Sequence, residues 1–126
     1  MKLNKIQAQH MDLTDPIREY AWNKITELEK FLPAGTMAQV DILLERTTEH
    51  HQKGDIFKAE VNVQVPGQLL NTEAVAGDLY AAIDKVRDEL QREMRQYKEK
   101  LSDKRIKGGR EAKEMMQESE LLNPDV

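Results

Sequence analysis

The feature that most constrains this chain is a stripe of apolar residues that recur at intervals of three or four over residues 79–101. That spacing places all of them on one side of an α-helix of about six turns. The stripe consists of Leu79, Ile83, Val86, Leu90, Met94, Tyr97 and Leu101. We expect the helix to begin near Gly77 or Asp78, with Asp78 as its N-terminal cap, and to end at Gly108-Gly109. One side of this helix must then pack against the rest of the domain.

Alternating apolar and polar residues predict strands elsewhere in the chain. In the segment IFKAEVNVQV, residues 56–65, every second side chain is apolar and those between are polar. A period of two this regular indicates a sheet with one covered face and one face in water. Weaker patterns predict further strands at residues 2–9, 40–44 and 69–75. Pro66-Gly67 forms the turn into the last strand, and the polar residues 45–55 connect the two strands before it.

A shorter helix is predicted after the motif LTDP. Thr14 or Asp15 can cap it, and Pro16 falls in its first turn, where the missing N–H costs no hydrogen bond. Its apolar stripe consists of Ile17, Ala21, Ile25, Leu28 and Leu32, and Pro33 and Gly35 follow. The element order is therefore β-α-β-β-β-α. This order predicts an α+β fold in which two helices cover one face of a four-stranded sheet.

Length and composition limit the class of protein. A chain of 126 residues predicts one domain. It contains no cysteine, so it has no disulfide framework, thiol nucleophile or cysteine-based zinc site. The N-terminal segment MKLNKIQAQH lacks the apolar stretch of a signal peptide, and no apolar run approaches the roughly 18–20 residues of a membrane span. We expect a cytoplasmic protein with no membrane partner.

Positive charge is concentrated in one segment of a chain that is acidic overall. The formal net charge is −4, yet ten of the nineteen Lys and Arg residues lie within residues 85–110, together with five acids. That segment carries +5, whereas residues 1–84 carry −5 and residues 111–126 carry −4. Screening limits the reach of a surface charge to about 8–10 Å, so the local excess decides what binds there. The local excess favours nucleic acid.

The cations of the long helix lie on two flanks of its apolar stripe. At 100° per residue, with Leu79 at zero, one flank lies between about 80° and 160°. This acid-poor flank consists of Arg87, Gln91, Arg95, Lys98, Ser102 and Arg105, with Asp84 as the only acid in its sector. The opposite, mixed flank consists of Lys85, Glu89, Arg92, Glu93, Gln96, Lys100, Asp103 and Lys107.

The two flanks differ in how many of their cations already have a partner. On the mixed flank, the spacings of Glu89–Arg92 and Asp103–Lys107 indicate ion pairs within the helix. On the acid-poor flank, cations free of acids can neutralise phosphates and release counterions. We expect the acid-poor flank to carry RNA binding and the cations of the mixed flank to contribute less. The alternative is that all of these cations only favour the helix and keep it soluble.

Two segments, and the element order between them, resemble one known family. The segments are LTDPIREYAWNKITELEKFL and KGDIFKAEVNVQVPGQLLNTEAVAGDLYAAIDKVRDELQREMRQYKEK. They are similar to the ribosome hibernation-promoting factor / ribosome-associated translation inhibitor family, also known as sigma-54 modulation proteins, over residues 1 to about 101. The resemblance implies a fold like a double-stranded-RNA-binding domain. It also implies binding to the small ribosomal subunit in the channel used by tRNA and mRNA, which holds idle ribosomes inactive.

The chain departs from this family in three respects. Glu89 and Glu93 stand where many members carry Lys or a neutral amide. The chain stops short of the second, dimerising domain of longer members, so we expect no dedicated dimerisation domain. It also extends past the shortest members. We expect residues 1–107 to form the ribosome-binding domain and residues 108–126 to form an acidic tail that is mostly disordered or weakly helical.

Four residues near the two helices complete the candidate interface or its surroundings. Lys24 matches a lysine of the family's first-helix pattern, although its place beside the stripe equally suits a packed stem with a solvated ammonium. Arg18 lies outside the stripe and joins the RNA-binding candidates. Tyr80 can either stack on a base or pack within the fold. The pattern does not decide whether Trp22 packs against the tail or stands exposed.

The sequence gives little support for catalysis. His50 and His51 are neighbours in a polar loop with Glu49 and Asp55, but adjacent side chains in an extended loop point apart, and no third ligand is fixed by spacing. The chain has no Gly-rich phosphate loop, nucleophile elbow or H-E-x-x-H motif. We expect no enzyme, cofactor, metal or small-molecule substrate. The remaining alternative is a protein-interaction module that uses the sheet face or edge.

Overall fold

The structure is a computed structural model that describes residues 1–47 and 54–115, with side chains described up to Asp103. Its elements, in chain order, are β1 (Lys2–Gln9), α1 (Asp15–Thr26), the 3₁₀ helix η1 (Glu27–Phe31), β2 (Gln39–Thr47), β3 (Ile56–Val65), β4 (Gln68–Ala76) and α2 (Leu79–Met115). Within these residues, no helix is both long and apolar enough to cross a membrane.

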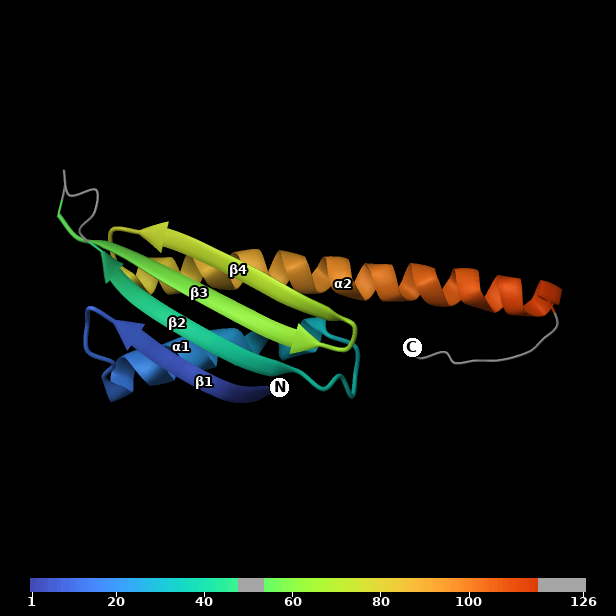
Figure 1. Ribbon diagram of the computed structural model, residues 1–126, viewed down its shortest axis with the longest axis horizontal. Coiled ribbons are helices and arrows are strands. Elements are labelled where there is room, and N and C mark those ends of the chain that lie inside the picture. Colours follow the sequence, from blue (N-terminus) through green and yellow to red (C-terminus); the bar gives the residue numbers. More distant parts are fainter. Residues whose placement is uncertain (48–53, 116–126) are drawn as a thin grey trace.

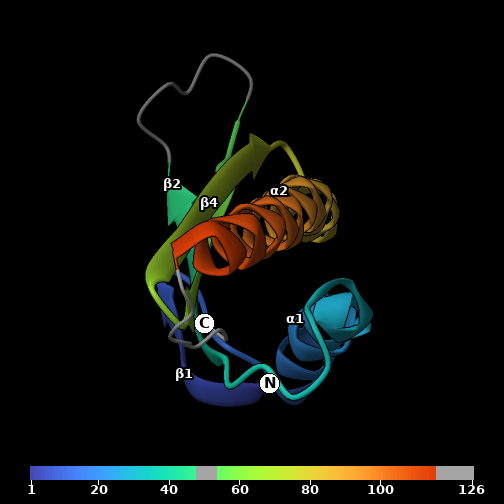
Figure 2. The ribbon, with the colours of Figure 1, turned by 90° about the vertical axis from the view of Figure 1, so that its right-hand side faces the viewer.

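The strands form one sheet in the order β1-β2-β3-β4. β1 runs parallel to β2, whereas β2 pairs with β3 and β3 with β4 in antiparallel fashion. A parallel pair needs a crossover connection, and α1 with η1 provides it between β1 and β2. Figure 2 shows α1 and α2 on the same side of the sheet. The predicted α+β fold, with two helices on one face of a four-stranded sheet, is confirmed.

The hydrophobic core lies between the covered face of the sheet and the helices. On β3, Ala59, Val61, Val63 and Val65 are buried, as their alternation predicted. The predicted stripe of α2 is buried from Leu79 to Tyr97, and Leu101 packs at its edge. Burial of this stripe fixes the rotation of α2 about its own axis, so it also fixes which cations point away from the sheet.

Two local signals in the sequence position α2 on the sheet. The N–H of Ala81 donates a hydrogen bond of 3.0 Å to Oδ2 of Asp78, so Asp78 is the predicted N-terminal cap. Gly67 has a φ of +80°, a conformation that favours glycine, in the predicted Pro66-Gly67 turn between β3 and β4. The hydroxyl of Tyr97 donates to the carbonyl oxygen of Pro66 at 2.9 Å. This bond ties the middle of α2 to the hairpin.

The first helix is shorter than the apolar stripe predicted. Its α-helical part ends at Thr26, and the chain continues as η1 before Leu32 takes an extended conformation with φ of −98° and ψ of 152°. A residue before proline is driven out of the α region, and the 3₁₀ turns tighten the chain ahead of Pro33. Leu28 and Leu32 are nevertheless buried, so the stripe predicted their burial correctly. It was wrong about their backbone, because Leu28 lies in a 3₁₀ helix and Leu32 is extended. Trp22 is partly buried against the core.

The second helix is longer than predicted. It passes through Gly108-Gly109 and ends at Met115, beyond the end of the sheet in Figure 1. Each glycine costs about 1 kcal/mol relative to alanine in a helix, and the good helix formers on both sides outweigh that cost here. The helix break predicted at Gly108-Gly109 is therefore wrong, and residues 108–115 are helical, while residues 116–126 lie outside the described part. The boundary of the ribosome-binding domain at residue 107 stays a prediction.

The connection between β2 and β3 is shorter than the polar residues 45–55 suggested. β2 continues through Glu45 and Arg46 to Thr47, and β3 begins at Ile56. Polar residues extend the ladder here because one side of the strand faces water. The His50-His51 pair lies outside the described residues. Among the described ones, no three His, Cys, Asp or Glu side chains gather as a metal site would require.

Candidate nucleic-acid interface

The acid-poor flank of α2 lies beside α1 and η1. Three contacts show this: the Tyr20 hydroxyl reaches Asp84, the Arg87 guanidinium reaches Glu27, and the Arg95 guanidinium lies over the Phe31 ring. The mixed flank borders β4 instead, because Nζ of Lys85 donates to the carbonyl oxygen of Val75 at 3.2 Å. Packing of the apolar stripe on the sheet thus separates the two flanks.

Arg87 does not belong to the free cations of this flank. Its Nε lies 3.2 Å from Oε1 of Glu27, and its Nη1 lies 3.2 Å from Oδ1 of Asp88 and from Oε1 of Gln91. Only 22% of its side chain is exposed. The expectation that no acid occupies Arg87 is wrong, because Glu27 comes from another element, 60 residues away in the chain. Arg87 bridges α2 to η1.

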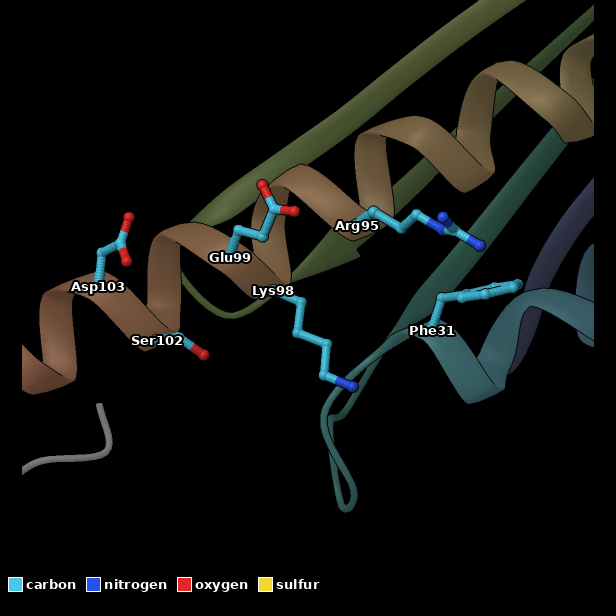
Figure 3. Close-up of a pocket in the computed structure, with 6 residues that line it drawn as sticks. All are labelled: Phe31, Arg95, Lys98, Glu99, Ser102 and Asp103. Carbon is cyan, nitrogen blue, oxygen red and sulfur yellow. The ribbon is translucent and has the colours of Figure 1, made fainter.

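Among the described side chains of the acid-poor flank, Arg95 and Lys98 are the exposed cations. Within the part of the chain that the structure describes, neither forms an ion pair with a carboxylate. The guanidinium carbon of Arg95 lies 4.9 Å from the centroid of the Phe31 ring, a cation–π contact that holds the side chain toward η1. Both residues line a surface hollow of about 570 Å³, together with Phe31, Glu99, Ser102 and Asp103. Figure 3 shows these side chains.

Lys98 also connects this hollow to a second one. The second hollow is lined by residues 29, 30 and 32–37 of the η1 end and the loop after it, and by Lys98. Met37 projects there with 82% of its surface exposed. The structure does not describe the side chain of Arg105, so the predicted flank is continuous as far as Ser102. Within the described side chains of this flank, Arg95 and Lys98 are the two cations that are exposed to solvent.

The cations of the mixed flank are arranged largely as predicted. Arg92 forms the expected ion pair with Glu89, one turn earlier in the helix. Lys85 donates to the Val75 carbonyl oxygen, and Lys100 is exposed. The predicted Asp103–Lys107 pair lies outside the described side chains. Arg92 and Lys85 therefore already have partners, so each adds less affinity for an RNA phosphate than an unpaired cation would.

A tyrosine pair joins α1 to the first turns of α2. The hydroxyl of Tyr20 donates to Oδ1 of Asp84 at 2.7 Å, and this bond, with burial and the Asp84 charge, raises the pKa of Tyr20 to about 12. The rings of Tyr20 and Tyr80 meet edge to face, with centroids 4.8 Å apart and planes at 81°. Nζ of Lys24 lies 5.5 Å from the Tyr20 centroid.

These contacts decide between some of the roles that the sequence left open. Lys24 is half-buried with its ammonium over the Tyr20 ring, a cation–π contact at the position beside the stripe. Tyr80 both packs on Tyr20 and keeps 40% of its surface exposed. Arg18 is exposed on α1. These three residues stay candidates for RNA contact, at the opposite end of the helix pair from Arg95.

Two aromatic residues of this surface were not singled out from the sequence. Phe31 lies within the polar-flanked segment ELEKF, and Tyr20 follows Ile17 by three positions at the edge of the stripe. Their pairing with residues of α2 depends on how the two helices pack, which periodicity does not encode. The sequence did offer one signal for them: each is an aromatic residue next to a residue of the apolar stripe, Tyr20 before Ala21 and Phe31 before Leu32.

Known proteins share this fold and this sequence pattern. The N-terminal domain of Thermus thermophilus Protein Y matches with a TM-score of 0.67 and 27% identity, over 77% of this chain and 99% of that chain. A ribosomal subunit interface protein from Coxiella burnetii shows the same fold with a TM-score of 0.62 and 21% identity, over 78% of this chain and 98% of that chain.

Two relatives in sequence are named as ribosome hibernation factors. A ribosome hibernation promoting factor of Pseudomonas putida is 33% identical over 100 residues, which cover 79% of this chain and 89% of that protein. The ribosome hibernation promotion factor of Deinococcus radiodurans is 29% identical over 108 residues, which cover 86% of this chain and 55% of that protein. This chain thus spans about half the length of the second relative. The family profile described as Sigma 54 modulation protein / S30EA ribosomal protein matches residues 4–102, and the chain belongs to that family.

Proposed function

We propose that this protein binds the small ribosomal subunit through rRNA phosphates in the channel used by tRNA and mRNA, and that it holds idle ribosomes inactive. Family membership and the hibernation-factor names of its relatives support the ribosome as the partner. The proposed role is binding rather than catalysis, in the cytoplasm, and requires no cofactor.

The observation that carries the RNA-binding part is the position of Arg95 and Lys98. Both cations are exposed, and within the described residues both lack a carboxylate partner. They lie on the segment with an excess charge of +5, and on a helix whose rotation the core fixes. Such cations release counterions when they neutralise phosphates, so they add affinity for RNA. Cations that are already paired add less.

A sedimentation assay tests the proposal. Purified protein is mixed with small subunits and with whole ribosomes, and the gradient is run at low salt and at raised salt. We expect co-sedimentation at low salt, with log K falling by about 0.7–0.9 per neutralised phosphate for each unit of log salt. In a cell-free translation system, near-stoichiometric protein should lower protein synthesis.

Two outcomes would count against the proposal. Protein that stays in the soluble fraction at low salt would remove the ribosome as its partner. Binding that hardly changes with salt would instead favour a protein-interaction module, because strand pairing at a sheet edge depends little on ionic strength. In that case the cations of α2 serve solubility alone.

A further inference from the structure

The hollow between η1 and α2 combines a flat cationic group, an aromatic ring and polar groups that can hold a phosphate. We infer that this hollow receives one unpaired nucleotide of RNA, with its base stacked on Arg95 and its phosphate on Lys98 and Ser102. This inference rests on the proposed function, and it names the kind of RNA element that the same surface accepts.

Phe31 supports the Arg95 side chain from η1. The centroid of the ring lies 4.9 Å from the guanidinium carbon, a cation–π contact that places the ring on one side of the group. Figure 3 shows the Arg95 side chain extended over the ring. A guanidinium supported by a ring on one side leaves its other side for a planar partner, and unpaired RNA bases stack on aromatic side chains and on Arg guanidinium planes. A phosphate alone would not need the ring.

The hollow is lined by charged side chains of both signs. Figure 3 shows Lys98 and Ser102 projecting from the side of α2 that faces η1, while the carboxylates of Glu99 and Asp103, which also line the hollow, point away from these two side chains. An anion beside Lys98 and Ser102 thus meets a cation and a hydroxyl donor before it meets an acid. The hollow, about 570 Å³, falls in the range of about 300–1,000 Å³ that small ligands occupy.

An unpaired nucleotide and a duplex differ in what they offer to Arg95. A duplex presents its phosphates outward and keeps its base faces stacked, so it cannot use the free face of Arg95. Stacking of a base on an aromatic side chain is worth about 1–3 kcal/mol in single-strand binders, or about fivefold or more in affinity, and we expect a stack on Arg95 to reach the lower end of that range. The hollow therefore favours loops, bulges and single strands over helical RNA.

An NMR titration tests the site directly. The ¹⁵N-labelled full chain is titrated with the tetranucleotide r(A)₄ and, separately, with adenosine monophosphate. We expect the largest shifts at Phe31, Arg95, Lys98 and Ser102, including the Nε–H of Arg95, and tighter binding of the tetranucleotide. Shifts that concentrate on the mixed flank, or binding of the mononucleotide alone, would overturn the inference.

Conservative variants separate stacking from charge. Arg95→Lys keeps the positive charge and removes the plane, so it should weaken r(A)₄ binding at least about fivefold. Phe31→Leu keeps the apolar volume and removes the ring, so it should also weaken r(A)₄ binding. A thermal melt checks that Phe31→Leu folds. Lys5→Gln, an exposed cation on β1 outside this surface, controls for loss of charge. An Arg95→Lys variant that binds like the unmodified protein contradicts the stacking role.

Small-subunit binding distinguishes failure of this inference from failure of the proposed function. If the unmodified protein binds subunits, and Arg95→Lys loses about as much affinity as Arg95→Gln, both proposals hold. If Arg95→Gln binds weakly and Arg95→Lys binds normally, Arg95 acts as a charge only, and the nucleotide site is wrong while the proposed function stands. If the unmodified protein does not bind subunits, the proposed function is wrong, and the inference falls with it.

Discussion

The hydroxyl of Tyr20 on α1 donates a 2.7 Å hydrogen bond to the Asp84 carboxylate on α2. This bond, followed by burial and the Asp84 charge, raises the pKa of Tyr20 from 10.0 to about 12. A raised pKa means that the folded state favours the neutral phenol more than the unfolded state does. The resulting stability is complete below the unfolded pKa and is lost as pH rises from about 10 to about 12.

Tyr20→Phe should therefore change how stability depends on alkaline pH. We expect the variant to be less stable near neutral pH by about 0.5–1.5 kcal/mol, the usual worth of one hydrogen bond. The difference from the unmodified protein should shrink between about pH 10 and pH 12. Urea unfolding at several pH values measures this difference in stability, and Tyr80→Phe serves as a control. A difference that stays constant across this range would contradict the assigned role of the bond.

Arg87→Gln should affect folding more than RNA binding. Its guanidinium joins α2 to Glu27 of η1 and is largely covered, so the substitution should cost about 0.5–1 kcal/mol, at the upper end for ion pairs near a surface. Arg92→Gln breaks only a pair within the helix and should cost less. Chemical unfolding measures the stability of both variants. The same measurement on Glu27→Gln and on the double variant Arg87→Gln/Glu27→Gln gives the coupling energy between Arg87 and Glu27. Additive effects of Arg87 and Glu27 would mean that the contact contributes nothing.

Tyr97→Phe tests the link between α2 and the β3–β4 hairpin. The change keeps the buried ring and removes the 2.9 Å hydrogen bond to Pro66, so we expect a loss of about 0.5–1.5 kcal/mol. Amide hydrogen exchange should rise most in the turn around Gly67. Uniformly raised exchange throughout the sheet would show instead that the hydroxyl supports the whole core.

Deleting residues 108–126 should leave a folded domain. Among the side chains described, which reach Asp103, the buried stripe of α2 extends to Tyr97 and the partly buried Leu101, well before the cut, so the melting temperature should hardly change. The deleted segment carries five acids, and their removal should tighten ribosome binding or leave it unchanged. Calorimetry and subunit binding measure the two effects. Loss of either stability or binding would refute the idea that this segment is dispensable.

The sequence predicted those parts of the fold that repeat at regular intervals. The stripe from Leu79 to Leu101 and the alternation in β3 each reflect a single buried face, so spacing alone located both. The end of the first helix was not predictable from its stripe, because Leu28 and Leu32 are buried equally well from 3₁₀ and extended backbone. The end of α2 was predicted wrongly, because two glycines lower helix stability without abolishing it.

The site was predictable only in part, for a related reason. Helical angles separated the acid-poor flank from the mixed flank, and they predicted the Glu89–Arg92 pair from neighbours in the same helix. They could not predict that Glu27 pairs with Arg87, nor that Phe31 supports Arg95, because these partners come from η1. Contacts between elements depend on packing, which a one-dimensional pattern does not specify.

The most direct test of the account compares two double variants in binding to small ribosomal subunits at two salt concentrations. Arg95→Gln/Lys98→Gln removes the exposed cations of the acid-poor flank, and Lys85→Gln/Arg92→Gln removes an equal charge from partnered positions. Circular dichroism checks that both fold. We expect the first variant to lose more affinity and to lower the salt slope by about 1 per cation removed. Greater loss in the Lys85/Arg92 variant would contradict the assignment of the RNA-binding flank.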